Sequence, residues 1–134
     1  MRETVPLCAT EMHRVLLVED DPEIRMLLRI ALTNDGFNVV EAQNGAAALD
    51  VLDSATPDVV VTDLLMPLID GIELVRFLRA SKAHANLPVL VITALNQDHR
   101  GVVEVQRQPG VVVTAKPFRP REVCQLVREM AEAA

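Results

Sequence analysis

Residues 57–67 read PDVVVTDLLMP, a run of β-branched apolar residues that ends at a carboxylate and is followed by a proline-containing loop. A short apolar run bounded by turn residues is typical of a strand that is buried on both faces of a sheet. Asp63 would then lie at the carboxyl end of this strand, where open α/β sheets bind their ligands. Aspartate is also a common turn and helix-capping residue, so the rest of the chain has to decide its role.

The same pattern, a short apolar run followed by an amphipathic stretch, occurs five times along the chain. Four further strands are predicted at 13–18, 37–41, 88–92 and 111–114. Strict alternation of strands with amphipathic helices requires a parallel sheet with right-handed crossovers and helices on both faces. The sequence therefore predicts a single α/β domain, a (βα)5 doubly wound parallel sheet of five strands.

Helix starts are marked by capping residues. Asp21 precedes a proline, Asn44 precedes an alanine-rich helix, and Pro120 opens the last helix. The stretch 98–108 is different, because it carries Gly101 and three valines and is a poor helix by propensity.

The composition of the chain excludes several classes of function. The 134 residues are 50% hydrophobic with a net charge of −6, which suits one compact domain and argues against a nucleic-acid or anionic-membrane surface. No apolar run approaches the roughly 18 residues of a membrane span, and no signal sequence is evident. We therefore expect a cytoplasmic protein without membrane insertion, in which Cys8 and Cys124 remain thiols. Residues 1–12 are predicted to be a flexible N-terminal extension and residues 13–134 the folded domain.

Five polar side chains follow the predicted strands. Because the carboxyl ends of parallel strands share one edge of the sheet, they should meet there. They are Glu19 and Asp20 after the first strand, Asp63 after the third, Thr93 after the fourth and Lys116 after the fifth. Three adjacent carboxylates repel one another unless a cation neutralises them, and their hard oxygens suit Mg²⁺.

A lysine and a hydroxyl beside such a metal site complete the parts of in-line phosphoryl transfer. Each part also has an ordinary interpretation. Glu19 and Asp20 could be a solvated helix entry, Thr93 a cap, and Lys116 a surface lysine packed on the sheet edge. Taken together, four strand ends that carry the required groups favour phosphoryl transfer to Asp63.

Several motifs carry a family resemblance. They are LVEDDP at 17–22, TDLLMP at 62–67 with Asp70-Gly71 beyond it, VITA at 91–94 and KPF at 116–118. Over residues 13–132 the chain resembles the receiver domain of two-component response regulators, of the chemotaxis-type, single-domain kind. The resemblance implies a flavodoxin-like fold with strand order 2-1-3-4-5.

The resemblance also implies partners and roles. Asp63 would accept a phosphoryl group from a histidine kinase or a histidine phosphotransferase, and the resulting acyl phosphate would switch contacts with an unidentified downstream protein. Thr93 and Lys116 would bind phosphoryl oxygens, and the Lys116-Pro117 peptide would be cis. Asp20, Asp63 and the backbone carbonyl of Leu65 would hold Mg²⁺, with Glu19 orienting a metal-bound water.

The chain departs from the family in its switch region. The family usually carries an aromatic residue three positions before the lysine, where this chain has Val113. Output through Thr93 therefore cannot use a ring that swings inward, and we expect a rearrangement of the segment 98–110 instead. Leu65 and Leu95 occupy positions that influence hydrolysis of the acyl phosphate in the family. Neither can orient an attacking water, so slow self-dephosphorylation is expected.

Two alternatives stay open. A Mg²⁺-dependent aspartyl-phosphate phosphohydrolase would use Asp63 as its nucleophile, but the second acid that such enzymes often carry two positions later is here Leu65. A structural receiver without phosphorylation is disfavoured because no pocket residue is missing. The expected protein is a signalling domain rather than an enzyme. It contains no helix-turn-helix, so direct nucleic-acid binding is not expected, and a fold that ends near Ala134 favours a stand-alone protein.

Overall fold

The computed structural model describes residues 13–133. Its elements are, in chain order, β1 (Arg14–Val18), α2 (Pro22–Asn34), β2 (Asn38–Ala42), α3 (Gly45–Ser54), β3 (Val59–Asp63), α4 (Gly71–Ala80), β4 (Val89–Thr93), α5 (Arg100–Gln106), β5 (Val111–Ala115) and α6 (Pro120–Ala133). The strands form one parallel sheet in the order β2-β1-β3-β4-β5, which confirms the predicted doubly wound fold. The predicted extension at 1–12 lies outside the described residues.

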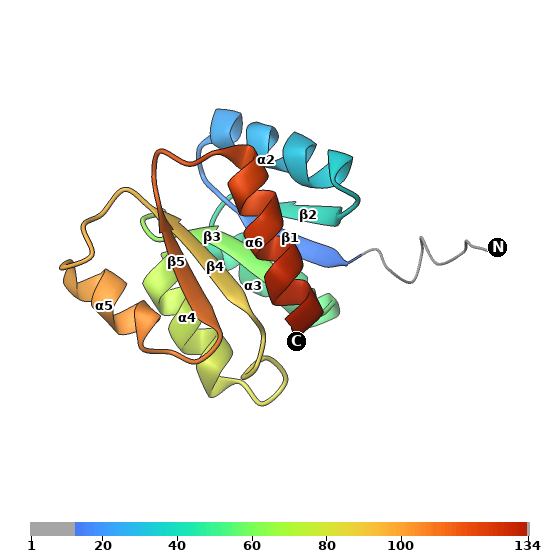
Figure 1. Ribbon diagram of the computed structural model, residues 1–134. Coiled ribbons are helices and arrows are strands. Elements are labelled where there is room, and N and C mark those ends of the chain that lie inside the picture. Colours follow the sequence, from blue (N-terminus) through green and yellow to red (C-terminus); the bar gives the residue numbers. More distant parts are fainter. Residues whose placement is uncertain (1–12, 134) are drawn as a thin grey trace.

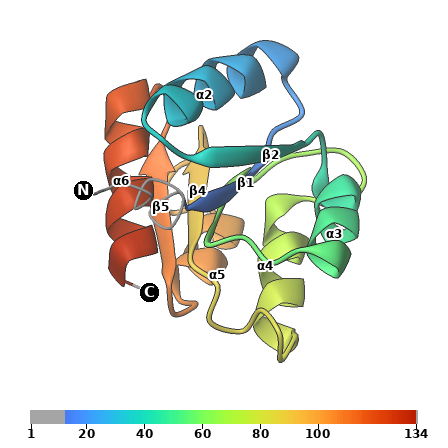
Figure 2. The same cartoon turned by 90° about the vertical axis from the view of Figure 1, so that its right-hand side faces the viewer.

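The sheet separates two layers of helices. Helices α2 and α6 cover one face, and α3, α4 and α5 cover the other (Figures 1 and 2). The alternation along β1 serves both layers: Val15 and Leu17 pack in the core under α2 and α6, whereas Leu16 and Val18 pack in the core under α3, α4 and α5. No helix among residues 13–133 is both long and apolar enough to span a bilayer.

Burial differs between the centre and the edges of the sheet. Every residue of β4 is buried, as are the first four residues of β3, because each of these strands has a neighbour on both sides. The edge strands β2 and β5 are largely exposed or half-buried. The continuous apolar runs expected of central parallel strands are therefore confirmed at β3 and β4.

Local capping positions the helices as the sequence predicts. Asp21 Oδ1 accepts from the backbone N–H groups of Glu23 (2.9 Å) and Ile24 (3.3 Å), and Asn44 Oδ1 accepts from that of Ala47 (2.8 Å). These bonds satisfy N–H groups that the first turn of a helix leaves without partners.

The stretch 98–108, a poor helix by propensity, nevertheless contains the short helix α5. Tertiary contacts explain this difference, because α5 packs against α4. Gly101 lies so close to Ile72 of α4 that a Cβ on the glycine would overlap the isoleucine side chain. The Arg76 guanidinium of α4 also forms an ion pair with Glu104 of α5. Packing thus outweighs the unfavourable propensity.

Candidate functional site

The parallel register brings the predicted polar side chains to one edge of the sheet. Glu19 and Asp20 follow β1, Asp63 is the last residue of β3, Thr93 is the last residue of β4 and Lys116 follows β5. In the register Asp63 lies beside Ile92, and Thr93 beside Ala115. Four strand ends therefore meet at the same edge, as the topology predicts.

Three carboxylates form a compact cluster. One oxygen each from Glu19, Asp20 and Asp63 lies within 4.8 Å of the others. Glu19 is only 3% exposed, whereas Asp20 is open to solvent and Asp63 is half-buried. A partly open cluster of carboxylate oxygens leaves room for water and substrate oxygens, which Mg²⁺ retains in protein sites. The residues present therefore fit a Mg²⁺ ion.

Glu19 is held in place from two sides. Its backbone N–H donates to the carbonyl of Ala42 on β2 (3.0 Å), and its carbonyl accepts from Arg25 Nη1 on α2 (2.8 Å). Its carboxylate accepts from the backbone N–H of Asp21 (3.1 Å). Arg25 was not predicted to support the site, since no local pattern reveals a hydrogen bond that forms only when α2 packs beside the end of β1.

Asp63 is oriented through both of its carboxylate oxygens. Oδ1 accepts from the backbone N–H of Leu64 (2.7 Å), and Oδ2 accepts from Lys116 Nζ (3.0 Å). The turn beyond is tight: the N–H of Gly71 donates to the carbonyl of Leu64 (2.8 Å), and a Cβ at position 71 would overlap the carbonyl oxygen of Asp63. Glycine is thus required here by the close approach of two backbone segments.

Lys116 supplies the positive charge of the site. Its Nζ lies 3.0 Å from Asp63 Oδ2 and 3.6 Å from Glu19 Oε1, and its backbone N–H donates to the Thr93 carbonyl (2.9 Å). The Lys116-Pro117 peptide is cis, as the resemblance implied.

The charges of the site are coupled. Burial raises the pKa of the Glu19 carboxyl, and repulsion by Asp63 raises it further, although the Asp21 N–H and Lys116 oppose this. Partial burial disfavours the charged form of Lys116, but its hydrogen bond to Asp63 and the attraction of Asp63 and Glu19 outweigh this and raise the pKa of the ammonium. Lys116 is therefore fully cationic at neutral pH.

Thr93 is buried at the same edge, with its hydroxyl in a local bond. Oγ1 accepts from the backbone N–H of Leu95 (3.1 Å), a bond within the turn after β4. The ordinary interpretation of Thr93 as a helix cap is wrong, because α5 begins at Arg100 and has His99 as its N-cap. A hydroxyl that accepts one bond still has its own proton to donate. Within residues 13–133, no hydrogen bond joins this hydroxyl to Asp63 or Lys116.

The residues predicted to shape output and lifetime lie around this centre. Val113 is half-buried on β5, opposite Val91 in the register, and packs against the core under α5. Leu65 is 55% exposed in the loop after Asp63, and Leu95 is half-buried against the same core. The slow self-dephosphorylation expected from these two leucines stays a prediction.

Known proteins resemble the chain over nearly all of this fold. The family model for the response regulator receiver domain matches residues 15–128. The sensor histidine kinase TmoS of Ectopseudomonas mendocina is 34% identical over 119 residues, which are 89% of this chain and 12% of that protein. The alkaline phosphatase synthesis transcriptional regulatory protein PhoP of Bacillus subtilis is 34% identical over 110 residues, which are 82% of this chain and 45% of that protein.

A solved structure shows the same likeness. The signal receiver domain of a signal transduction histidine kinase from Syntrophus aciditrophicus has a TM-score of 0.83 and 28% sequence identity. The match covers 91% of this chain and 92% of that one. By contrast, the chain spans less than half the length of the two curated relatives described above.

Proposed function

The chain belongs to the family of response regulator receiver domains, and we propose that Asp63 is its phosphoacceptor, phosphorylated by a histidine kinase or a histidine phosphotransferase. As a member of this family it is a signalling domain of a two-component system. The observation that carries the proposal is the bond between Asp63 and Lys116 inside the acidic cluster. It sets a nucleophilic carboxylate beside a cation and a candidate metal site.

The transfer proposed for this site exchanges one bond for another. A carboxylate oxygen of Asp63 forms a bond to phosphorus while the bond between phosphorus and the donor's histidine nitrogen breaks. The electron pair of the broken bond stays on the imidazole, which is then protonated from solvent. Asp63 becomes an acyl phosphate, and the side chain gains negative charge that the domain has to accommodate.

The chain's own residues stabilise that charge. The ammonium of Lys116 lies 3.0 Å from Asp63 Oδ2 before transfer. After transfer it binds an oxygen of the phosphoryl group and neutralises part of the negative charge of that group. Thr93 donates its hydroxyl proton to a phosphoryl oxygen. The N–H of Leu64 holds the other carboxylate oxygen, so the nucleophile keeps its orientation.

Mg²⁺ is the cofactor we propose for this site. Asp20, Asp63 and the backbone carbonyl of Leu65 would hold the ion, and Glu19 would orient a water bound to it. When bound, Mg²⁺ supplies positive charge that shields the incoming phosphoryl group from the carboxylates. The cluster of three carboxylates supports this assignment.

The output we propose is a change in protein contacts on the β5 and α5 side. Val113 lacks the ring used elsewhere in the family, so the segment 98–110 is expected to carry the change by its own rearrangement. We also propose that the chain works in the cytoplasm and that these residues themselves do not bind nucleic acid. The second proposal concerns only this chain, because PhoP is named a transcriptional regulatory protein and is longer.

The alternative, a phosphohydrolase acting on other molecules, lacks support at the position where such an enzyme would need its second acid. That position is Leu65, whose side chain is apolar and exposed. Turnover of a generic phosphomonoester by the purified protein would revive this alternative.

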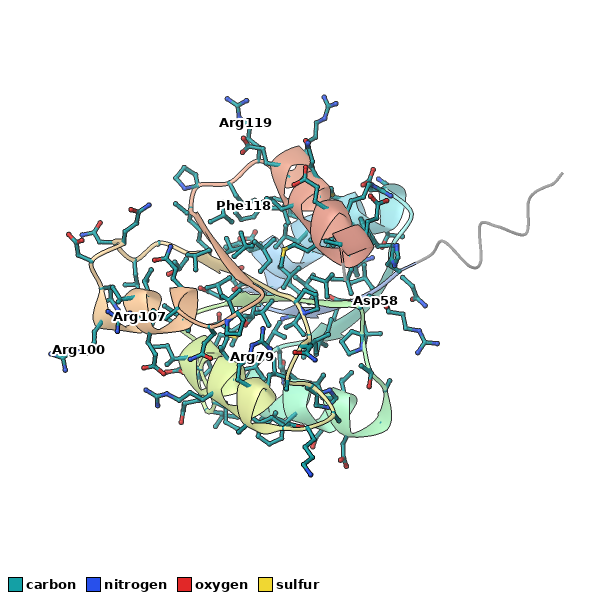
Figure 3. All side chains as sticks on the ribbon, turned by 60° about the horizontal axis from the view of Figure 1, so that its bottom comes forward. Asp58, Arg79, Arg100, Arg107, Phe118 and Arg119 are labelled. Atoms are coloured by element: carbon teal, nitrogen blue, oxygen red, sulfur yellow. The ribbon has the colours of Figure 1, made fainter. Side chains whose placement is uncertain are left out.

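Phosphotransfer profiling tests the proposal. The purified chain is incubated with Mg²⁺ and each phosphorylated histidine kinase of its organism, beside the variants Asp63→Asn and Asp58→Asn. Asp58 is a matched control because it precedes the opposite end of β3, and Figure 3 shows it well away from Phe118 and Arg119, which follow the site lysine. We expect rapid labelling of the native chain and Asp58→Asn and none of Asp63→Asn; labelling of Asp63→Asn would overturn the proposal.

A further inference from the structure

The loop that joins Asp63 to α4 is held in one conformation at both ends. The Gly71 N–H donates to the Leu64 carbonyl (2.8 Å), which joins the two ends of the loop, and the Gly45 N–H at the start of α3 donates to the Ile69 carbonyl near the second end (3.0 Å). Gly45 approaches Ile69 so closely that a Cβ on the glycine would overlap the carbonyl oxygen. Between these anchors Met66 is buried in the core. The exposed side chains of this loop are therefore displayed on a fixed backbone.

Leu68 stands out in this loop for two independent reasons. Its φ is +68°, and no other non-glycine residue among residues 13–133 has a positive φ. Its side chain is also 76% exposed, so burial does not offset the strain of the left-handed conformation. Glycine or asparagine adopts this conformation more readily than leucine does. Strained residues that the surrounding structure holds in place concentrate at functional sites.

Leu65 and Leu68 are two exposed apolar side chains of the loop that follows Asp63. Leu65 is 55% exposed two residues beyond Asp63, and Leu68 follows three residues later in the same loop. An exposed apolar surface beside a reactive group is typical of a contact surface for another molecule.

We propose that Leu68, supported by Leu65, is the apolar contact on which the phosphohistidine-bearing partner protein sits during transfer. This inference rests on the proposed role of Asp63 as phosphoacceptor. A protein donor has to bring a histidine side chain within bonding reach of Asp63, so its surface must cover the loop that carries Asp63. A small phosphodonor of a few atoms has no surface that could cover this loop. The partner surface that faces this loop should accordingly present apolar side chains next to its histidine.

The size of the effect follows from the exposed area. Burying a leucine side chain at an interface changes affinity by about 10- to 100-fold. Because the contact is made with the bound partner and not with the phosphoryl group, its loss should raise KM for the protein donor while kcat changes little.

The test compares two phosphodonors on the full chain with Mg²⁺. One is the kinase that labels the chain fastest in the profiling experiment, and the other is acetyl phosphate. The variants are Leu68→Asn, which suits the left-handed backbone and removes the apolar contact, and Leu68→Met, which keeps an apolar side chain. Phe77→Gln removes an exposed apolar side chain on α4, outside this loop, and is the matched control.

We expect Leu68→Asn to raise KM for the kinase at least tenfold, with labelling by acetyl phosphate unchanged. Leu68→Met and Phe77→Gln should behave like the native chain. An unchanged KM for the kinase would overturn the inference, as would an equal loss with both donors, which would mean that Leu68 shapes the pocket. A shorter acyl-phosphate lifetime with unchanged transfer would also overturn it, because Leu68 would then protect the acyl phosphate from water instead of binding the partner protein. If the native chain were not labelled by either donor, the proposed function itself would fail.

Discussion

The central strand β3 and the edge strand β5 both contribute to the site, but the structure holds them very differently. On β3, residues Val59–Thr62 are buried between β1 and β4, and both carboxylate oxygens of Asp63 accept hydrogen bonds. On β5, which has only β4 as a neighbour, Val112 is exposed and Val113 is half-buried. The proposed phosphoacceptor therefore ends a strand that is packed on both sides, whereas the proposed output surface includes an edge strand that is packed less tightly.

The largest change in phosphorylation rate is expected from Lys116→Met, which alters the contact between the ends of β5 and β3. The substitution removes the cation that joins the end of β5 to Asp63, so phosphorylation by acetyl phosphate should slow by about 10²- to 10³-fold. Arg119→Met, which removes an exposed cation three residues later, should leave the rate unchanged. The initial rate of phosphoryl incorporation measures both variants, and a rate for Lys116→Met within threefold of the native rate would contradict this role.

Substitutions of two glycines test how far the end of β3 and the helix α5 can each accommodate an added methyl group. In Gly71→Ala the new Cβ overlaps backbone atoms of Asp63 and Leu64, which cannot yield, so we expect a loss of about 2–3 kcal/mol in the free energy of unfolding. In Gly101→Ala the Cβ meets the flexible tip of the Ile72 side chain, and alanine regains up to about 1 kcal/mol of helix propensity. The net change there should stay within about 1 kcal/mol. Urea unfolding measures the free energy of unfolding of both variants. Equal losses would show that the end of β3 is packed no more rigidly than α5.

The same distinction explains what could be predicted from the sequence. The site at the sheet edge was predictable because parallel topology brings strand ends together, and the caps at Asp21 and Asn44 were predictable because they act locally. The helix α5 followed from the strand–helix alternation, but its own residues are poor helix formers. The contacts that stabilise it, such as Gly101 with Ile72, link distant positions and could not be predicted. The positive φ of Leu68 also follows from anchors outside its own sequence neighbourhood.

A smaller effect concerns the pH dependence of Mg²⁺ binding. Burial raises the pKa of Glu19 above its ordinary value, so on acidification Glu19 takes up a proton at a higher pH than an exposed glutamate would. Protonation removes negative charge from the cluster, and Mg²⁺ affinity should fall by up to about tenfold per pH unit below the raised pKa. In Glu19→Gln the part of this pH dependence that comes from Glu19 should be lost, leaving a weaker affinity with a shallower pH profile. Titration of Mg²⁺ at several pH values measures it, and identical pH profiles would count against a raised pKa.

The sign of the accompanying stability change follows from the same shift. A carboxyl whose pKa is raised by folding stabilises the metal-free domain below its ordinary pKa, and that contribution is lost as the pH rises through the raised value. Glu19→Gln should therefore make the metal-free domain more resistant to urea at neutral pH than the native chain. A lower resistance would show that Glu19 is stabilised as a carboxylate.

The smallest effect is expected in the backbone of the output region. When a phosphoryl mimic binds at Asp63 with Mg²⁺, amide chemical shifts should change in β5 and across residues 98–110, whereas β2, at the other edge of the sheet, should remain unchanged. Shift changes confined to the residues around Asp63 would mean that the segment 98–110 does not carry the signal.

The central claim, that Asp63 is the phosphoacceptor, is tested most directly by chemical trapping. The full chain is phosphorylated with acetyl phosphate and Mg²⁺, the acyl phosphate is reduced with borohydride, and the modified residue is located by peptide mass spectrometry. We expect modification at Asp63 alone, dependent on Mg²⁺ and absent in Asp63→Asn. Modification at Glu19, Asp20 or any other carboxyl, or at Asp63 to the same extent without Mg²⁺, would contradict it.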